Sequence, residues 1–479
     1  MEFVRVVQPR SFLASQAGLT ALAVALSCAA AASYAVYQSP FAPLLVGLGL
    51  CGAAVLASWV RRPVWALYAA IAAVFLPAGI LPASWQSDLN RGMTVVACGV
   101  WLIAVIVQRR PVIVTGAARW MLVFIGWAAF TLFWADDVSA AWIGIQAYAL
   151  RLLLCLLLIA NLVRTRDQLD GLMATLALCG WVLIAACAAS LVAEGYAPGS
   201  RLQILSMNEN QAGVLALMTM MGVLWQAMRV DQAHRMAAVL VGSLFISLAL
   251  LVTAATGSRG SAISFVVTFA VFWLWQPTRI WGKLGLVILL VAVLVAPFVF
   301  TTLAARFAVE HGDTLLGRRE DLWLAAWRMI LDHPWTGVGI FNAPQAMVRY
   351  VEATRGVGQF ESVAIHNPVL TIWAETGLPG LLLYMAVPVS ATATFVHHWL
   401  RDKRAGDRRL TPYYALIAAI AAGYLVSWIK GGGVEADRAY FLLLALLTLP
   451  SHLVLERRSD AGGEGGGSSP RVREGWLIW

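Results

Sequence analysis

Charged residues are scarce in this sequence: Asp, Glu, Lys and Arg make up 12% of its 479 residues, whereas 60% are hydrophobic. Soluble domains carry about a quarter charged residues and are nearly half apolar. Together with the mean hydropathy of +0.76, this composition excludes a soluble globular protein and predicts an integral membrane protein.

Cysteine is absent from every long polar loop, because all six cysteines fall within apolar segments. That distribution argues against a disulfide framework and against a thiolate metal site, so we interpret them as small core residues. The first apolar run is not followed by an A-x-A cleavage site, and we expect it to be a retained helix.

The chain has no concentrated basic block, although its net charge is +9. Its arginines are scattered among short loops, a distribution that orientation signals and anionic lipid explain better than nucleic acid does. We therefore expect membrane lipid and no nucleic acid among the partners. An internal repeat of the kind found in transporters is also missing.

Apolar segments fill most of the chain. A helix needs roughly 20 apolar residues to cross a hydrocarbon core of about 30 Å, and about fourteen segments approach that length, of which we accept twelve. The predicted fold is an all-α polytopic membrane protein with about 12–14 transmembrane helices and one long periplasmic loop. The expected parts are transmembrane helices in 1–303, a loop with amphipathic helices in 304–367, further transmembrane helices in 368–457, and a disordered cytoplasmic tail in 458–479. The segments are 13–36, 41–60, 64–82, 92–108, 118–135, 141–163, 172–193, 212–228, 236–255, 261–275, 284–303, 368–396, 412–429 and 439–455.

The basic residues predict the orientation. If the N-terminus is cytoplasmic, every inside segment carries at least two Lys or Arg residues, as the positive-inside rule requires. Both ends are then cytoplasmic and residues 304–367 lie outside. In that loop, 316–331 is expected to form a helix with Leu316, Trp323, Trp327 and Ile330 on one apolar face, and 343–354 a second short helix. Asp332-His333-Pro334 should end the first helix.

Three predicted segments that enter the membrane from outside begin with polar clusters. Asn and Ser favour the N-cap position, and Pro368 after Asn367 is a strong helix start. If the three helix starts converge, their free N–H groups and nearby arginines form a site for a phosphate or pyrophosphate. The clusters are Arg201 with Asn208-Glu209-Asn210-Gln211, then Thr256-Gly257-Ser258-Arg259-Gly260, then His366-Asn367-Pro368.

Each of these residues also has a structural interpretation. The outer arginines can pair with local acids, and a lone histidine at a helix start is often a hydrogen-bonding residue. An imidazole beside helix N-termini and arginines is nevertheless biased toward its neutral form, which suits a general base. Arg151 and Glu375 lie within apolar segments, where structural pairing is the safer interpretation. Asp136-Asp137 has no third ligand nearby, so we expect a solvated loop there, no metal and no cofactor.

Several motifs between about 200 and 380 together resemble the O-antigen ligase and polymerase superfamily of bacterial inner-membrane glycosyltransferases. Their order, spacing and shared outer side make the combination more specific than any one of them. The motifs are Asn208-Glu209-Asn210-Gln211-Ala212, Thr256-Gly257-Ser258-Arg259-Gly260, Arg318/Arg319 with Trp323, Asp332-His333-Pro334-Trp335-Thr336-Gly337-Val338-Gly339, His366-Asn367 and Glu375-Thr376-Gly377-Leu378-Pro379-Gly380.

The resemblance implies a metal-independent enzyme that passes a glycan from undecaprenyl diphosphate to an acceptor hydroxyl at the periplasmic face. Carried over, Arg201 and Arg259 would hold the diphosphate, with Arg318 or Arg319 as helpers, and His366 would take the acceptor proton. Asn208, Asn210, Ser258, Asn367 and Glu375 are expected to support the site. The favoured acceptor is lipid A–core, as in ligases; a second lipid-linked glycan, as in O-antigen or exopolysaccharide polymerases, is the alternative.

Two other classes compete with this reading. A lipid-linked-glycan flippase should place polar residues along a pathway at the bilayer midplane, where only Arg151 and Glu375 qualify. A structural scaffold protein would leave the outer arginines and His366 replaceable.

Overall fold

The structure, a computed structural model, describes residues 52, 54–77, 80–194, 202–204, 207–299, 319–355, 363–429 and 438–453. These residues form helices and no strand, so the predicted all-α fold is confirmed. The predicted segments at 13–36 and most of 41–60, and the tail from 458, lie outside this range. Within it, nine helices are long and apolar enough to span a membrane, and three apolar helices are shorter. The protein is a multi-pass membrane protein.

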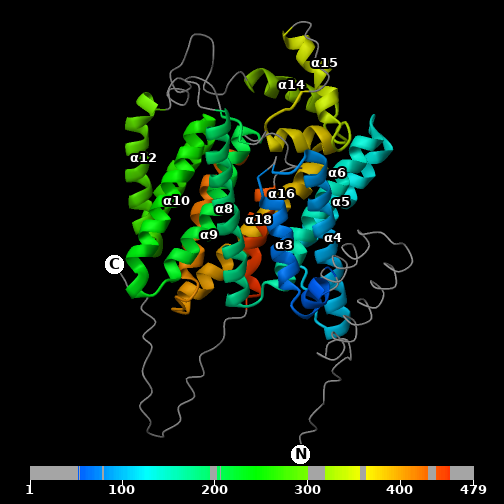
Figure 1. Ribbon diagram of the computed structural model, residues 1–479. Helices are drawn as coiled ribbons and strands as arrows, with labels where there is room; N and C mark the ends of the chain where they lie inside the picture. The colour runs from blue at the N-terminus through cyan, green and yellow to red at the C-terminus, as the bar shows by residue number, and fades with distance from the viewer. Residues whose placement is uncertain are drawn as a thin grey trace, which may run out of the picture.

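The spanning helices alternate in direction through the bundle (Figure 1). The helices are α3 (Val64–Phe75), α4 (Ala83–Gln108), α5 (Gly116–Phe130), α6 (Val138–Arg151), α7 (Ile159–Leu162), α8 (Arg166–Glu194), α9 (Glu209–Arg229), α10 (Arg235–Thr256), α11 (Arg259–Leu274), α12 (Arg279–Val299), α14 (Arg319–Asp332), α15 (Ala343–Arg355), α16 (Pro368–Arg404), α17 (Thr411–Ile429) and α18 (Arg438–Thr448). Between α6 and α7 the helix continues as the π-helical segment η3 (Leu152–Leu158), and η2 (Thr131–Phe133) and η7 (Leu449–Ser451) are single 3-10 turns.

Several boundaries differ from the predicted ones. α3 ends at Phe75, and α4 begins at Ala83, so the short segment expected at 92–108 is part of a helix of 26 residues. α16 continues to Arg404, and three of the basic residues expected in a loop after 396, Arg401, Lys403 and Arg404, occupy its last turn. Hydropathy locates the apolar part of a helix but not the polar turns by which it extends beyond the hydrocarbon core.

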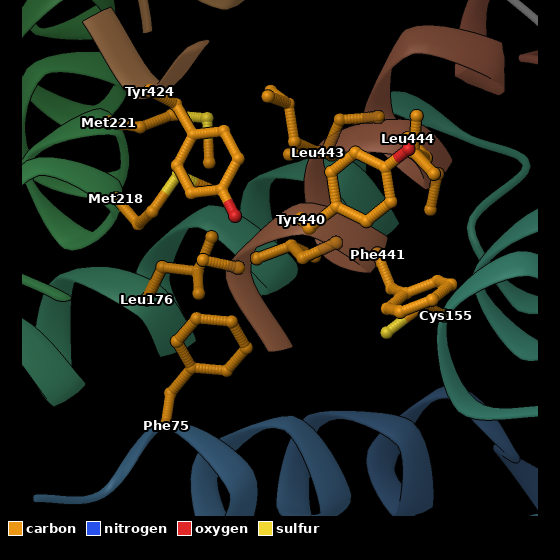
Figure 2. Close-up of a cluster of buried hydrophobic side chains, with 14 of the residues drawn as sticks. Phe75, Cys155, Leu176, Met218, Met221, Tyr424, Tyr440, Phe441, Leu443 and Leu444 are labelled. Carbon is orange, nitrogen blue, oxygen red and sulfur yellow. The ribbon is translucent and has the colours of Figure 1, made fainter. Parts of the chain in front are cut away.

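α18 is the central helix of the bundle. Ten of its eleven residues are buried, as expected for a helix that is apolar all round. Figure 2 shows its side chains among residues of neighbouring helices and of η3. The labelled contacts of the cluster are Phe75 on α3, Cys155 on η3, Leu176 on α8, Met218 and Met221 on α9, and Tyr424 on α17. The buried cysteines Cys155, Cys179 and Cys187 are unbonded core residues, as predicted.

Neighbouring helices approach closely where small residues face backbone. A Cβ at Gly222 of α9 would overlap the Met173 carbonyl of α8, and one at Gly423 of α17 would overlap the Ser264 carbonyl of α11. In lipid, such close packing replaces the hydrophobic driving force between helices. Large apolar side chains such as Ile106, Met236 and Leu294 point away from the bundle and are more than 60% exposed, as lipid-facing residues are.

α14 and α15 form a separate layer at one end of the bundle, which we call the α14/α15 end (Figure 1). Their small core includes Met329, Ile330 and Met347, together with Ile365 just before α16 and Ala374 in the first part of α16. The two predicted helices and the stop at Asp332 are confirmed, whereas the predicted start of the first helix, with Leu316, lies outside the described residues. The predicted apolar face of α14 is only partly correct, because Ile330 is buried but Trp327 is 42% exposed. Ala325 and Ala326 fill the crossing with α15 and α16 instead.

Candidate active site

The starts of α9 and α11 are joined by hydrogen bonds between their capping residues. Asn208 caps α9, accepting from the Asn210 N–H at 2.9 Å, and Ser258 caps α11, accepting from the Ser261 N–H. The Ser258 hydroxyl donates to Asn210 Oδ1 at 2.8 Å. Two of the three predicted helix starts therefore lie together, with Arg259 as the first residue of α11.

The start of α16 has the predicted cap. Asn367 Oδ1 accepts from the N–H groups of Val369 and Leu370 at 3.0 and 3.2 Å, and Pro368 is the first helical residue. His366, immediately before the cap, has φ of 56°, in the left-handed region that L residues other than Asn, Asp and His seldom occupy. Backbone strain of this kind persists where the surroundings fix it and is concentrated at functional sites.

A break in α16 lies nine residues after its start. Gly377 has φ of 67° and ψ of −178°, so the helix is interrupted there. The break frees the carbonyls of Ala374 and Glu375. Val338 N–H donates to the first and Gly339 N–H to the second, both at 2.9 Å.

The loop that supplies these N–H groups is the motif Trp335-Thr336-Gly337-Val338-Gly339. The backbones touch: a Cβ at Gly377 would overlap the Trp335 carbonyl, and a Cβ at Gly337 would overlap the Glu375 carbonyl. Both glycines have positive φ, so only glycine fits both the conformation and the space.

Two tryptophans hold this junction against the membrane bundle. Trp127 of α5 donates from Nε1 to the Thr376 carbonyl at 2.8 Å, and Trp134 donates to the Thr336 carbonyl at 3.2 Å. The Thr131 hydroxyl accepts from the Ile340 N–H at 3.1 Å. Because the first half of α16 is fixed on both sides, His366 at its start is held by a rigid support.

We expect Gly377→Ala to destabilise the protein by about 2–4 kcal/mol, because it forces a strained φ and a clash with the Trp335 carbonyl. Thermal unfolding of the purified variants measures this. Gly92→Ala on α4 is the matched control, since a Cβ there meets nothing within 4 Å. Equal unfolding temperatures for the two variants would contradict a rigid junction.

Arg259 and Arg319 interact electrostatically, and so do Arg319 and His366. Burial lowers the pKa of the Arg319 guanidinium, and the charge of Arg259 lowers it further. Burial likewise lowers the pKa of His366, with a second contribution from the charge of Arg319. Arg259 of α11 therefore lies near Arg319 of α14, and Arg319 lies near His366 before α16, where burial and charge both favour the neutral imidazole.

Arg259 is partly buried and lies at the start of α11. Within the part of the chain that the structure describes, its side chain has no hydrogen bond or ion pair. Two guanidinium groups that act on each other across a partly buried space favour an anion between them.

The other predicted site residues have different outcomes. Arg201 and Arg318 lie outside the described residues; the neighbouring Leu202 N–H donates to the Ala255 carbonyl at 3.0 Å, which joins the chain before α9 to the end of α10. Glu375 is 2% exposed, within the broken part of α16. Asp137 is the N-cap of α6, and its carboxylate accepts from the Ala140 N–H at 2.9 Å, which lowers its pKa.

Several supporting residues escaped prediction from the sequence. Asn342 accepts from the Asp137 N–H at 2.7 Å and donates to the Ile340 carbonyl, so it joins the α14/α15 layer to α6. Trp127, Thr131 and Trp134 read as ordinary residues of an apolar segment. The presence of a tryptophan near a helix end does not distinguish an interfacial anchor from a tertiary hydrogen-bond donor.

The fold and the site define a class: a polytopic α-helical membrane protein with a basic site and a histidine at one end of the bundle. Residues 244–385 match the sequence model of a family described as O-antigen ligase. The matched segment includes Arg259, Arg319, His366 and both halves of the α16 junction. The match supports the O-antigen ligase superfamily and confirms the resemblance expected from the motifs. No curated protein matches the chain.

This family match supports a function of the O-antigen ligase or polymerase type in general, which is a glycosyl-transfer reaction. A membrane-lipid-linked substrate is consistent with such a function.

Proposed function

We propose that the protein transfers a glycan from undecaprenyl diphosphate to an acceptor hydroxyl at the periplasmic face of a bacterial inner membrane. The acceptor that we favour is lipid A–core. Both chain ends are then cytoplasmic, and the α14/α15 end is periplasmic. The observation that carries the proposal is the neighbourhood of Arg259, Arg319 and a neutral His366 at the starts of α11 and α16.

In the proposed reaction, His366 removes the proton from the acceptor hydroxyl as its oxygen attacks the anomeric carbon of the donor sugar. The bond between that carbon and the diphosphate oxygen breaks, and the lipid diphosphate leaves with the electron pair. Negative charge grows on the departing oxygen. Arg259 and Arg319, with Arg201 and Arg318 as further candidates, stabilise that charge, so that guanidinium groups act where a metal ion acts in other transferases.

The remaining candidates have positioning roles. Asn208, Asn210 and Ser258 join the starts of α9 and α11, so they fix the direction from which Arg259 approaches the diphosphate. Asn367 fixes the start of α16 and with it the imidazole of His366. Glu375 lies in the broken segment, whose carbonyls bind the Trp335–Gly339 loop.

The pH dependence provides one test. A general base must be neutral, and the pKa of His366 is below its ordinary value of 6.5, so kcat/KM should fall only at pH values below 6.5. Arg319→Gln removes a charge that lowers this pKa, so the acidic limb of the profile should move to higher pH, toward 6.5. Rates of glycan transfer measured from pH 5 to 8 give the result.

Arg328→Gln is the matched control, because Arg328 is an exposed arginine on the same helix. Its acidic limb should coincide with that of the unmodified protein. If both variants left the limb unchanged, His366 would not be the group that titrates.

Ligation and polymerisation differ in acceptor, not in donor chemistry. The purified protein, given a defined undecaprenyl-diphosphate glycan, should produce glycosylated lipid A–core when that acceptor is present. Extension of the glycan on a second donor molecule, with lipid A–core unmodified, would overturn ligation in favour of polymerisation.

A further inference from the structure

A second basic cluster lies at the end of the bundle opposite α14 and α15. Arg164 follows α7, His398 is in the last part of α16, and His452 follows η7. The charges of Arg164 and His398 both act on His452, and Arg110 acts on Arg164. Three segments that are far apart in the sequence therefore bring basic side chains together, well away from His366.

Arg164 is held in place through the Nη2 atom of its guanidinium group. Its Nη2 donates to the Pro111 carbonyl at 2.9 Å and to Asn161 Oδ1 at 3.2 Å. Asn161 is itself fixed, accepting from the Ile113 N–H and donating to the Ile113 carbonyl, both at 2.8 Å. The Arg164 Nε atom is buried without a hydrogen-bond partner among the described residues.

Each of the two histidines also has one ring nitrogen without a hydrogen-bond partner among the described residues. These nitrogens are His452 Nε2 and His398 Nδ1, and both are buried. Buried polar atoms are nearly always satisfied in native proteins, by protein, water or ligand. A ligand with several oxygen atoms can accept hydrogen bonds from Arg164 Nε and from whichever of the two imidazole nitrogens carries a proton.

The protonation of His452 follows from its neighbour. Ser451 donates its single hydroxyl proton to the Thr448 carbonyl at 2.7 Å, so toward His452 its oxygen can only accept. His452 Nδ1, 3.1 Å away, is therefore the donor, and Nε2 carries no proton while the ring is neutral. An anion can accept a hydrogen bond from Nε2 only after the ring takes up a proton. The nearby Arg164 guanidinium disfavours a metal cation at the same atom.

We propose that Arg164 and His452 bind a phosphate group, carried by an anionic lipid headgroup or by a free anion, and that His452 takes up a proton when the phosphate binds. Basic pockets between transmembrane helices on the cytoplasmic side suit lipid headgroups of this chemistry. The site is independent of the transferase reaction proposed above.

The direction of the pH dependence follows from the surroundings of His452. Burial, with the charges of Arg164 and His398, lowers its pKa to about 4, so the empty site is unprotonated at neutral pH. A bound phosphate raises this pKa, and affinity must then increase as the pH falls from neutral toward 4. The other charged groups near His398 are Arg401, His397 and Asp402, and Asp402 is already engaged by Arg401 and Tyr414.

The test uses the full-length protein in nanodiscs of phosphatidylcholine with added phosphatidylglycerol, whose phosphodiester does not titrate near neutral pH. Native mass spectrometry counts the bound phosphatidylglycerol. His452→Gln and Arg164→Gln should each weaken binding by about tenfold, as the loss of one charge-assisted hydrogen bond does. The unmodified protein should bind several-fold more tightly at pH 5.5 than at pH 7.5, and His452→Gln should remove that difference.

Arg404→Gln is the matched control, because Arg404 is an exposed cation at the same end of the bundle. Its affinity should stay within about twofold of the unmodified value, as expected for an exposed charge. Stabilisation by inorganic phosphate without retention of phosphatidylglycerol would identify the free anion as the ligand. Unchanged binding in both site variants, or an equal loss in Arg404→Gln, overturns the proposal; if one site variant fails to insert, the other and the pH dependence of the unmodified protein decide.

Discussion

His366→Ala should reduce glycan transfer by about a thousandfold while leaving expression, membrane insertion and thermal stability nearly unchanged. General base catalysis typically contributes between a hundredfold and ten-thousandfold. Alanine cannot take the acceptor proton, because its side chain has no basic group. Transfer by purified protein from a lipid-diphosphate donor is the measurement.

His333→Ala is the control for this result. His333 lies in the loop that packs on the break in α16, but its side chain is exposed. Its variant should therefore retain most of the transfer rate. Normal transfer by His366→Ala would remove His366 from the mechanism, and equal losses in both variants would point to a structural effect on the loop.

Arg259→Lys should lower kcat/KM by about a hundredfold although the charge is kept. Lysine is a compact point charge and lacks the planar fork that binds two phosphate oxygens at once. Removal of one donor to a developing negative charge typically costs a hundredfold to a thousandfold. Initial rates with a defined undecaprenyl-diphosphate glycan, compared at saturating and low donor concentration, separate the effects on kcat and KM.

Arg349→Gln serves as the control, because Arg349 is an exposed arginine on α15. Its rate should remain within about twofold of the unmodified rate. If Arg259→Lys transferred glycan normally, the guanidinium geometry would be irrelevant, and Arg259 would serve orientation in the membrane or pairing with an acid.

The helix starts were predictable because their signals are local. Asn208, Ser258 and Asn367 each satisfy N–H groups two or three residues ahead, and Pro368 has a backbone angle suited to the first turn. The sequence therefore indicates where α9, α11 and α16 begin. Their proximity was only an assumption, since the hydrogen bond from Ser258 to Asn210 joins residues 48 positions apart.

The support of the site could not be predicted for the same reason. The Gly337 and Gly377 motifs each indicate a turn or a kink, but nothing in their spacing shows that the two backbones touch. The buried face of α14 is a similar case. Large apolar residues at helical spacing suggested Trp327, yet the partner helices accept Ala325 and Ala326, and Trp327 instead packs edge-on against Trp373 at 5.5 Å between ring centroids.

The most direct test of the central claim is transfer by the purified protein in proteoliposomes that contain EDTA, with undecaprenyl-diphosphate glycan and lipid A–core on the side of α14 and α15. We predict glycosylated lipid A–core without any divalent metal, and loss of that product in His366→Ala and Arg259→Lys. Movement of the donor across the membrane with no new glycosidic bond would contradict the account and indicate a flippase.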